Sequence, residues 1–389
     1  MPSYISSNAN RFYAALEASY GQAASVTSAN RFPAVRLEAQ QILQRGKRVD
    51  KTGTRTFLGT SPDSRRNTAF EVRTYLTSWT APAEPGYGPL FQAALGGTPG
   101  LSTGLVVAST QGDNAIQTTT PHGLSVGSAV SYMNEIRFVT AVQNASSISM
   151  NAPFSNALAA NAALMPTLTF SLATGLPSVT LYDYWDPISA VSRIVTGAAV
   201  DTFSFSANGD FHEFVFNGPA CDLLNSTSFV AGSAGLNTFP AEPALQEFDY
   251  SVVPGHLGQA WIGSAPDQFF TVTQATIELK NNIDLRNQEY GSSYPRDIAA
   301  GQRQVSSTFS LFTQDDNQTT ALYDAAQQRD QISAMLQLGL RNGELMGIFL
   351  PSVTPEIPNY VDSEVRLQWD FKNNLAQGTA ENELYIAFA

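Results

Sequence analysis

The residue types that most often carry catalysis or bind metals are few in this chain and lie far apart. Its three histidines are His122, His212 and His256, and its single cysteine is Cys221. Their spacing fits neither an H-E-x-x-H zinc motif nor a cluster of thiolate ligands. One cysteine cannot form an internal disulfide, which is typical of a chain that folds in a reducing compartment. We therefore expect no metal site.

Paired carboxylates are the remaining candidates for chemistry. Asp183 with Asp186, and Asp315 with Asp316, could in principle serve glycoside hydrolysis, which uses two acids flanking the glycosidic bond. Short-range acid pairs are also common at turns and helix caps. No nucleophile elbow, P-loop or dinucleotide-binding fingerprint opens a predicted helix in this sequence. It therefore favours a protein that is not an enzyme and has no cofactor.

The elements that would position side chains are predicted to be mainly antiparallel β-strands. Apolar and polar residues alternate with a period of two in residues 35–42, 70–79, 270–279, 305–312 and 365–371. Two more strands, 335–339 and 346–351, flank a turn at 341–343. One helix is predicted over residues 315–329, because acidic residues open it and Leu322, Ala325 and Ala326 have helical spacing. The predicted fold is an antiparallel β-sandwich with one flanking helix.

The chain is predicted to divide into three parts. Residues 1–96 and 177–389 form one β domain, and residues 97–176 form a small inserted β module. The inserted part is rich in Ala, Ser, Thr and Gly, and short strand patterns occur near 120–130, 136–142 and 147–150. A flexible low-complexity linker is the alternative interpretation of this region.

Charge is distributed unevenly along the chain, whose formal net charge is −12. Eleven of the 21 basic residues lie in the first 73 positions, against five acidic ones. A long polar loop, residues 45–67, contains most of them: Arg45, Lys47, Arg48, Lys51, Arg55, Arg65 and Arg66. Phe57 is the single aromatic residue between Arg45 and Arg66, so the run favours docking on an acidic neighbouring subunit over nucleic-acid binding.

Charged residues make up only 14% of the chain, where about 25% is usual for soluble domains. A surface this poor in charge is typical of a subunit that is covered by partners. The N-terminal residues lack the basic and apolar regions of a secretory signal. The longest uncharged run is interrupted by Pro and polar residues, so we expect no membrane span.

Several segments, in their order along the chain, resemble the major tail tube proteins of long-tailed, siphovirus-like bacteriophages. The resemblance covers nearly the whole chain and rests on pattern rather than on one diagnostic motif. In the C-terminal part it is carried by ELKNN at 278–282, YGSSYP at 290–295, AGQRQVSSTF at 300–309 and GIFLP at 347–351. Further segments are PLFQAAL at 89–95, PSVTL at 177–181, HGLSVG at 122–127 and EIRFV at 135–139.

The resemblance implies a structural virion protein, made in the cytoplasm of the bacterial host, that self-assembles into rings stacked as a tail tube. In that family the inner sheets join as a continuous barrel through which DNA is ejected without specific binding. The expected partners are other copies of the chain, the tape measure protein, the tail terminator and the distal tail or baseplate proteins, with no membrane. The loop at 45–67 corresponds to the family's contact with the adjacent ring, and we expect charge reversal at Arg48 and Arg55 to block polymerisation.

A neutral or acidic wall would let DNA pass, because a basic wall would hold phosphates. The predicted lumen-facing residues are Glu38, Gln40, Glu71, Gln274, Thr276 and Glu278. Arg36 and Arg73 fall on the same strand faces, and we expect them to pair with Glu38 and Glu71 across the strands. The period of two does not show which face of the sheet points inward.

The sequence leaves some alternatives open. The ring could be a hexamer, or a trimer of internally duplicated subunits, since residues 201–216 and 305–312 have loosely similar patterns. A baseplate or distal tail component with a host-binding insertion is the alternative function. A glycan-cleaving enzyme on a β scaffold is the third possibility.

Overall fold

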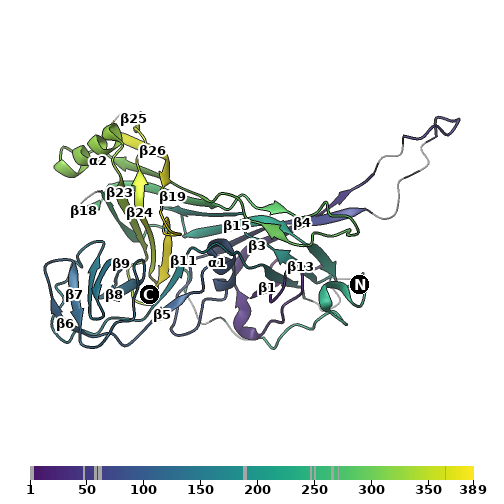
Figure 1. Cartoon of the computed structure of the whole chain (residues 1–389), viewed down its shortest axis with the longest axis horizontal. Helices are drawn as coiled ribbons and strands as arrows, with labels where there is room; N and C mark the ends of the chain where they lie inside the picture. Colours follow the sequence, from purple (N-terminus) through teal and green to yellow (C-terminus); the bar gives the residue numbers. More distant parts are fainter. Residues whose placement is uncertain are drawn as a thin grey trace.

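The computed structural model describes residues 4–46, 49–56, 59, 64–186, 191–245, 248, 251–263, 267–269, 271–363 and 365–389. In these residues the chain is mainly β and its strands pair in antiparallel fashion, which confirms the predicted class (Figure 1). A long inner sheet is covered on one face by two outer sheets, and a smaller sheet packs beside them. This is the layered arrangement that strands with one apolar face require.

The inner sheet runs in the order β3-β4-β15-β14-β19-β22-β26-β25. Every second residue is buried along most of its central strands, for example Phe70 and Val72 in β4, and Phe214 and Phe216 in β15, whereas β3 and β26 bury fewer residues. The opposite face is polar, so the period-two prediction holds for these strands. Their bounds are β3 Ala34–Gln44, β4 Arg65–Tyr75, β14 Thr202–Ala207, β15 Glu213–Ala220, β19 Val272–Lys280, β22 Gln304–Phe312, β25 Asn359–Ser363 and β26 Arg366–Ala376.

The first outer sheet, in the order β16-β13-β12-β1-β2, covers one end of the inner sheet. Between the two layers lies a helix that the sequence did not predict, α1 (Gly88–Leu95). Its Phe91 is fully buried, with its ring 5.4 Å from that of Phe203 and 5.2 Å from that of Phe216. The strands of this sheet are β1 Arg11–Leu16, β2 Arg31–Phe32, β12 Val179–Tyr184, β13 Arg193–Ala198 and β16 Asp222–Asn225.

The second outer sheet covers the other end, in the order β18-β17-β23-β24-β27-β11-β5. It is continuous with the inner sheet, because the end of β24 pairs with the end of β26. The predicted helix is α2 (Asn317–Gln328), which packs on β17 through Leu322 and neighbouring small residues. The single flanking helix of the prediction is thus one of two α-helices in the described residues. The strands are β5 Gly100–Ser102, β11 Thr167–Ser171, β17 Gly258–Gly263, β18 Asp267–Phe269, β23 Ile332–Leu338, β24 Met346–Thr354 and β27 Tyr385–Phe388.

The small sheet lies within the predicted insertion and has the order β6-β7-β10-β9-β8. It has its own apolar core, which includes Ile116, Val139 and Ile148. This region is therefore a folded module rather than a linker. Strands β5 and β11, although inside residues 97–176, belong to the second outer sheet. The module strands are β6 Val107–Thr110, β7 Ala115–Thr118, β8 Ala129–Tyr132, β9 Glu135–Asn144 and β10 Ser147–Met150.

The chain passes through one series of elements twice. The first repeat is β1, β2, β3, β4, α1, β12, β13, β14, β15 and β16. The second repeat is β17, β18, β19, β22, α2, β23, β24, β25, β26 and β27. The strand pairs of the two repeats correspond in order. The pair β1-β2 corresponds to β17-β18, β1-β12 to β17-β23, β3-β4 to β19-β22, β4-β15 to β22-β26, and β13-β16 to β24-β27.

The module is inserted between α1 and β12, where the second repeat has only residues 329–331 between α2 and β23. A duplication is therefore present in the topology. It does not relate the two segments that suggested it in the sequence, however. Residues 201–216 contain β14 and the start of β15, whose counterparts are β25 and β26, whereas residues 305–312 lie in β22, the counterpart of β4.

Candidate assembly surface

The polar face of the inner sheet gathers all six residues predicted to face a lumen. Glu38 is paired with Glu71 between β3 and β4, so both project from one face. On β19, Glu278 and Thr276 lie opposite Ser204 and Ser206 of β14. Gln40 and Gln274 occur at alternate positions on the same strands, β3 and β19, and are exposed.

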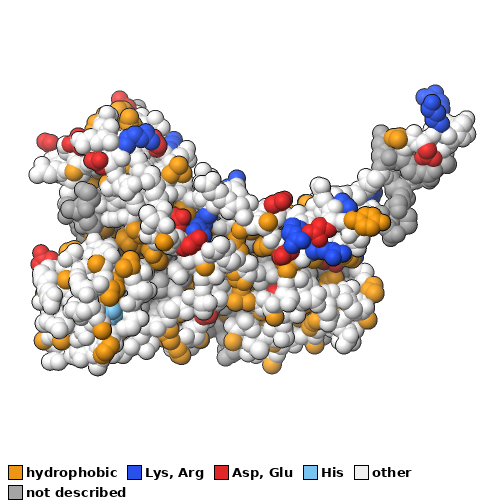
Figure 2. Space-filling model, viewed as in Figure 1, with side chains coloured by type: hydrophobic (Ala, Val, Ile, Leu, Met, Phe, Trp, Pro, Cys, Tyr) orange, Lys and Arg blue, Asp and Glu red, His pale blue; other side chains and the backbone are white. Residues whose placement is uncertain are grey.

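This face is directed away from α1 and the first outer sheet, which lie below the inner sheet in Figure 1. Figure 2 shows that the upper side of the molecule is hollowed between the end that carries α2 and the end from which residues 49–56 project. Red and blue side chains lie next to one another along this surface. The face is thus both concave and mixed in charge.

The two arginines on this face are paired with its acids, although of the predicted pairs across β3 and β4 only Arg36 with Glu71 is present among these contacts. Arg36 contacts Glu38 at 2.9 Å and Glu71 at 2.8 Å. Arg73 contacts Glu71 at 2.8 Å and Glu213 at 3.6 Å. The hydrogen bonds from Arg73 and Arg36 lower the pKa of Glu71, so this carboxylate stays ionised. Pairing leaves this part of the surface close to neutral.

The predicted contact loop divides into a projecting part and a part held in the sheet. Arg45, Lys51 and Arg55 are exposed, and residues 49–56 project beyond the body of the molecule (Figure 1). Lys47 and Arg48 lie outside the described residues. Arg65 and Arg66 belong to β4 rather than to the loop, because that strand begins two residues before residue 67, where the predicted loop ends.

Arg65 and Arg66 contact their own chain. The Arg66 guanidinium lies 4.2 Å from the Tyr294 ring centre and 3.8 Å from the Asp222 carboxylate. Arg65 donates a hydrogen bond to the Glu289 carbonyl at 3.5 Å. Tyr294 and Glu289 belong to the connection between β19 and β22, the counterpart of the long loop. This second connection therefore folds back onto the first repeat.

Both ends of the inner sheet are strands with one hydrogen-bonded neighbour. In the described part of the chain, β3 pairs only with β4, and β25 pairs only with β26. Exposed apolar side chains occur at both ends, at Val35 and Ile42 of β3 and at Tyr360 and Val361 of β25. The sequence analysis missed β25, whose residues do not alternate between apolar and polar side chains. Such edges are sites for further strand pairing.

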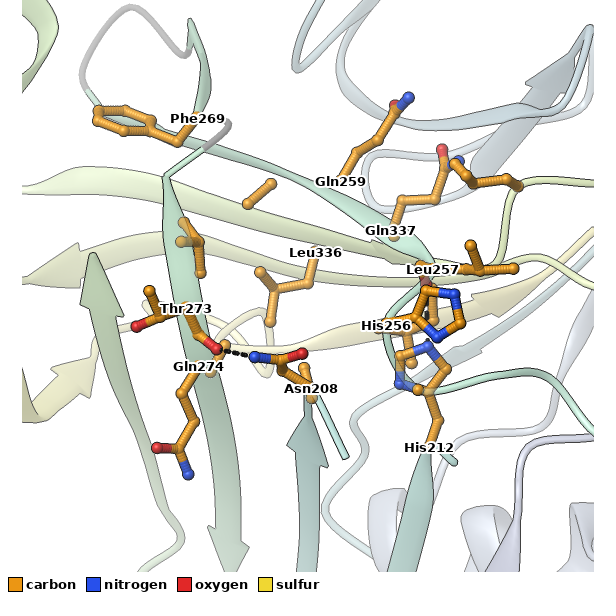
Figure 3. Close-up of a pocket in the computed structure, with 18 residues that line it drawn as sticks. Asn208, His212, His256, Leu257, Gln259, Phe269, Thr273, Gln274, Leu336 and Gln337 are labelled. Atoms are coloured by element: carbon orange, nitrogen blue, oxygen red, sulfur yellow. Dashed lines mark hydrogen bonds between the residues drawn. The ribbon is translucent and has the colours of Figure 1, made fainter. Parts of the chain in front are cut away.

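A cavity of about 350 Å³ lies beside the junction of β14 and β19. His212 and His256 lie next to each other at its wall (Figure 3). The Nε2 of His212 donates to the Leu257 carbonyl at 3.0 Å, and its Nδ1 is buried with no hydrogen-bond partner among the described atoms. Burial lowers the pKa of His212, so the ring favours its neutral form.

Of the other candidates for chemistry, Asp183, Asp316 and Cys221 have structural environments, whereas Asp186 and Asp315 are exposed. Asp183 is buried in an ion pair with Arg193 at 2.5 Å, and Asp316 caps α2 by accepting from the Thr319 amide at 2.6 Å. Burial raises the pKa of the Cys221 thiol to about 12, which disfavours the nucleophilic thiolate.

Within the described ranges, no group of three or more His, Cys, Asp or Glu side chains could hold a metal ion. None of the described helices combines the length and hydrophobicity needed to cross a bilayer.

The module is fixed to the second repeat by a buried arginine that the sequence analysis did not identify. Arg137 contacts Glu135 at 3.0 Å, and its guanidinium lies 4.0 Å from the Trp261 ring centre. Burial lowers the pKa of Arg137 to about 10. Phe138 stacks on Phe349 of β24 with 5.2 Å between ring centres. The module is therefore packed on the outer layer, away from the polar face of the inner sheet.

Comparisons with known proteins add no relative to this description. No protein-family model matches the chain, and no curated protein matches its sequence.

Proposed function

We propose that this chain is a structural subunit that self-assembles into rings and stacked tubes, as the tail tube protein of a long-tailed bacteriophage does. The observation that carries the proposal is the inner sheet, which joins two topologically equal repeats and ends in two edge strands. Closing such a sheet into a barrel removes its edges. The resemblance in sequence supports the same function.

The polar face of the inner sheet suits the wall of a channel for DNA. Its arginines Arg36 and Arg73 are neutralised by Glu38, Glu71 and Glu213. A wall of paired charges and neutral polar groups offers few uncompensated cations to phosphates, so DNA would slide rather than bind. The partners in this function are other copies of the chain, a tape measure protein inside the tube, and terminator and distal tail proteins at its ends.

The duplication favours the trimeric alternative for the ring. If the ring contains six tube domains, as the sequence resemblance implies, three copies of a chain with two such domains fill it. The same chain would carry only one module, and this module would face outward because it packs on the second outer sheet. The protein would be located in the virion after assembly in the host cytoplasm.

The test is negative-stain electron microscopy of the purified protein at high concentration, with and without added salt. We expect hollow tubes with a lumen of about 20 Å or more, which a duplex needs when its major groove alone is about 12 Å wide. Closed rings or trimers that never stack would instead favour a baseplate or distal tail component. Hydrolysis of cell-wall polysaccharide by the same preparation would favour a glycan-cleaving enzyme.

A further inference from the structure

The chain contains within itself a junction between the two repeats that can serve as a template for the contact between copies. In the order of strands across the inner sheet, the first repeat ends at β14 and the second repeat begins at β19. At this junction β14 pairs with β19. The counterpart of β14 is β25, and the counterpart of β19 is β3. These counterparts are the two end strands of the inner sheet, and they point in the directions that antiparallel pairing between two copies requires.

A bulge at the same place in both repeats fixes which residues of β3 and β19 correspond. In the first repeat the register shifts between Ala34, opposite Thr74, and Arg36, opposite Arg73. In the second repeat it shifts between Val272, opposite Leu311, and Gln274, opposite Ser310. Because a bulge inserts one residue at a defined point, Ala34 corresponds to Val272 and Thr74 to Leu311. Further along, Leu37 corresponds to Ala275 and Ala39 to Ile277.

The aromatic pairs on the next strands extend this correspondence to the other edge. Thr74 lies opposite Phe214 in the first repeat, and Leu311 lies opposite Trp369 in the second, so Phe214 corresponds to Trp369. Phe214 is in turn paired with Phe205 of β14, and Trp369 is paired with Tyr360 of β25. Tyr360 therefore corresponds to Phe205.

The internal register then predicts the register between copies. Inside the chain, Phe205 lies opposite Ile277 and Ser206 lies opposite Thr276. We propose that β25 of one copy pairs antiparallel with β3 of a second copy, in the register that these pairs define. The resulting pairs are Asn359 with Gln40, Tyr360 with Ala39, Val361 with Glu38, and Asp362 with Leu37. This inference rests on the proposed function, because it states how copies join into the ring.

Burial at the two places supports this assignment. Phe205 is 1% exposed at the internal junction, whereas its counterpart Tyr360 is 57% exposed at the end of the sheet. Pairing with a second copy would cover the Tyr360 side chain, as pairing with β19 covers Phe205, and would satisfy the outer backbone groups of both strands. The contact is heterologous, with different surfaces on the two copies, so repetition closes a ring when the rotation fits.

Mixing two variants of the full chain, each with one cysteine added to Cys221, tests the contact and its direction. A tagged Val361→Cys protein is mixed with untagged Glu38→Cys protein and oxidised at assembly concentration. We expect disulfide-linked heterodimers and few homodimers, because opposite residues on paired strands bring their Cβ atoms to about 4.5–5.5 Å. The wild-type chain is the control for Cys221, which is buried.

The register is tested with partners shifted by two residues. Mixtures of Val361→Cys with Arg36→Cys or with Gln40→Cys place the Cβ atoms about 7–8 Å apart. We expect these mixtures to cross-link several-fold more slowly than Val361→Cys with Glu38→Cys. Equal or faster cross-linking of a shifted pair, or Val361→Cys homodimers as the main product, would overturn the proposed junction.

Microscopy of the same samples separates this inference from the function on which it rests. Tubes that form without the heterodimer would overturn the junction and leave the tube function standing. Cross-linked closed rings that never stack would support the junction and count against the tube function. Protein that neither assembles nor cross-links at high concentration would contradict both.

Discussion

The two connections between paired inner strands, residues 45–64 in the first repeat and 281–303 in the second, differ although the strands around them match. In the first connection, residues 49–56 project beyond the body of the molecule, with Lys51 and Arg55 exposed (Figure 1). The second folds back, and its Tyr294 packs on Arg66 of the first repeat. Topology is thus retained where strands must pair, while the two connections differ in conformation and contacts.

The helices differ in the same manner. Helix α1 is buried on nearly all sides between two sheets, and the side chain of its N-cap residue, Tyr87, makes no capping hydrogen bond. Helix α2 buries one face and is capped by Asp316. We infer that packing stabilises α1, whereas packing and capping together stabilise α2. The predictions below test the comparison between the repeats, beginning with the largest expected effect.

Charge reversal in the projecting connection should abolish stacking. The double variant Lys51→Glu with Arg55→Glu should remove tubes from electron micrographs, because the exposed cations would no longer meet acidic residues of the next ring. The unfolding free energy of the monomer should change by less than about 0.5 kcal/mol, as is usual for exposed sites.

The matched control lies in the other connection. Arg286 is paired with Glu289 and Asp297 inside residues 281–303, so Arg286→Glu should leave stacking intact. Normal tubes in the double variant, or loss of tubes in the control, would show that the two connections do not have separate tasks.

Truncation in the buried helix should cost more stability than truncation in the surface helix. Phe91→Ala should lower the unfolding free energy by about 3–5 kcal/mol, because it opens a cavity among Phe170, Phe203 and Phe216. Leu322→Ala should cost about 2–3 kcal/mol, at the lower end for buried leucines. Urea unfolding of dilute, unassembled protein measures both, and the reverse order would contradict the assignment of α1 to the core.

Removing the cap should affect α2 modestly. Asp316→Ala should cost about 1 kcal/mol, because the Thr319 amide loses its acceptor. Asp316→Asn is the control, since Asn also caps helices well and should cost only a few tenths of a kcal/mol. If the two substitutions prove equally costly in urea unfolding, capping is not what Asp316 contributes.

The internal junction should be slightly sensitive to acid. Burial lowers the pKa of His212 in the folded chain below its ordinary value of 6.5. Just below that pH the unfolded chain binds the proton more readily, so the unfolding free energy should fall as the pH falls through 6.5. His212→Gln should flatten this dependence in urea titrations between pH 5 and 8. A slope that persists unchanged would assign the acid sensitivity to other groups.

Much of the sheet could be predicted from the sequence because a strand with one buried face leaves a local pattern. The alternation at 70–79 and 305–312 reflects the buried faces of β4 and β22. The same alternation predicts that Glu38, Glu71 and Glu278 lie on one face of the sheet. It also places Arg36 and Arg73 on that face, near acids with which they can form ion pairs.

Features that depend on contacts between distant segments were missed. Helix α1 is apolar on nearly every side, so it lacks the one-sided pattern of a surface helix. The duplication is visible in the pattern of strand pairing rather than in the sequence. Phe214 and Trp369, for example, occupy corresponding positions, but the sequences around them are not similar. The role of Arg137 arises from Trp261, which lies in the second repeat. Local periodicity carries none of this information.

End-on views of assembled particles test the central claim most directly. Because each chain has two inner repeats and one outer module, head-to-tail joining of three copies predicts threefold symmetry, with six similar units in the inner wall and three outer lobes. Averaged electron micrographs of single rings would show this arrangement. Six outer lobes around a sixfold wall, or twofold particles in which like edges meet, would contradict the equivalence of the two repeats in the ring.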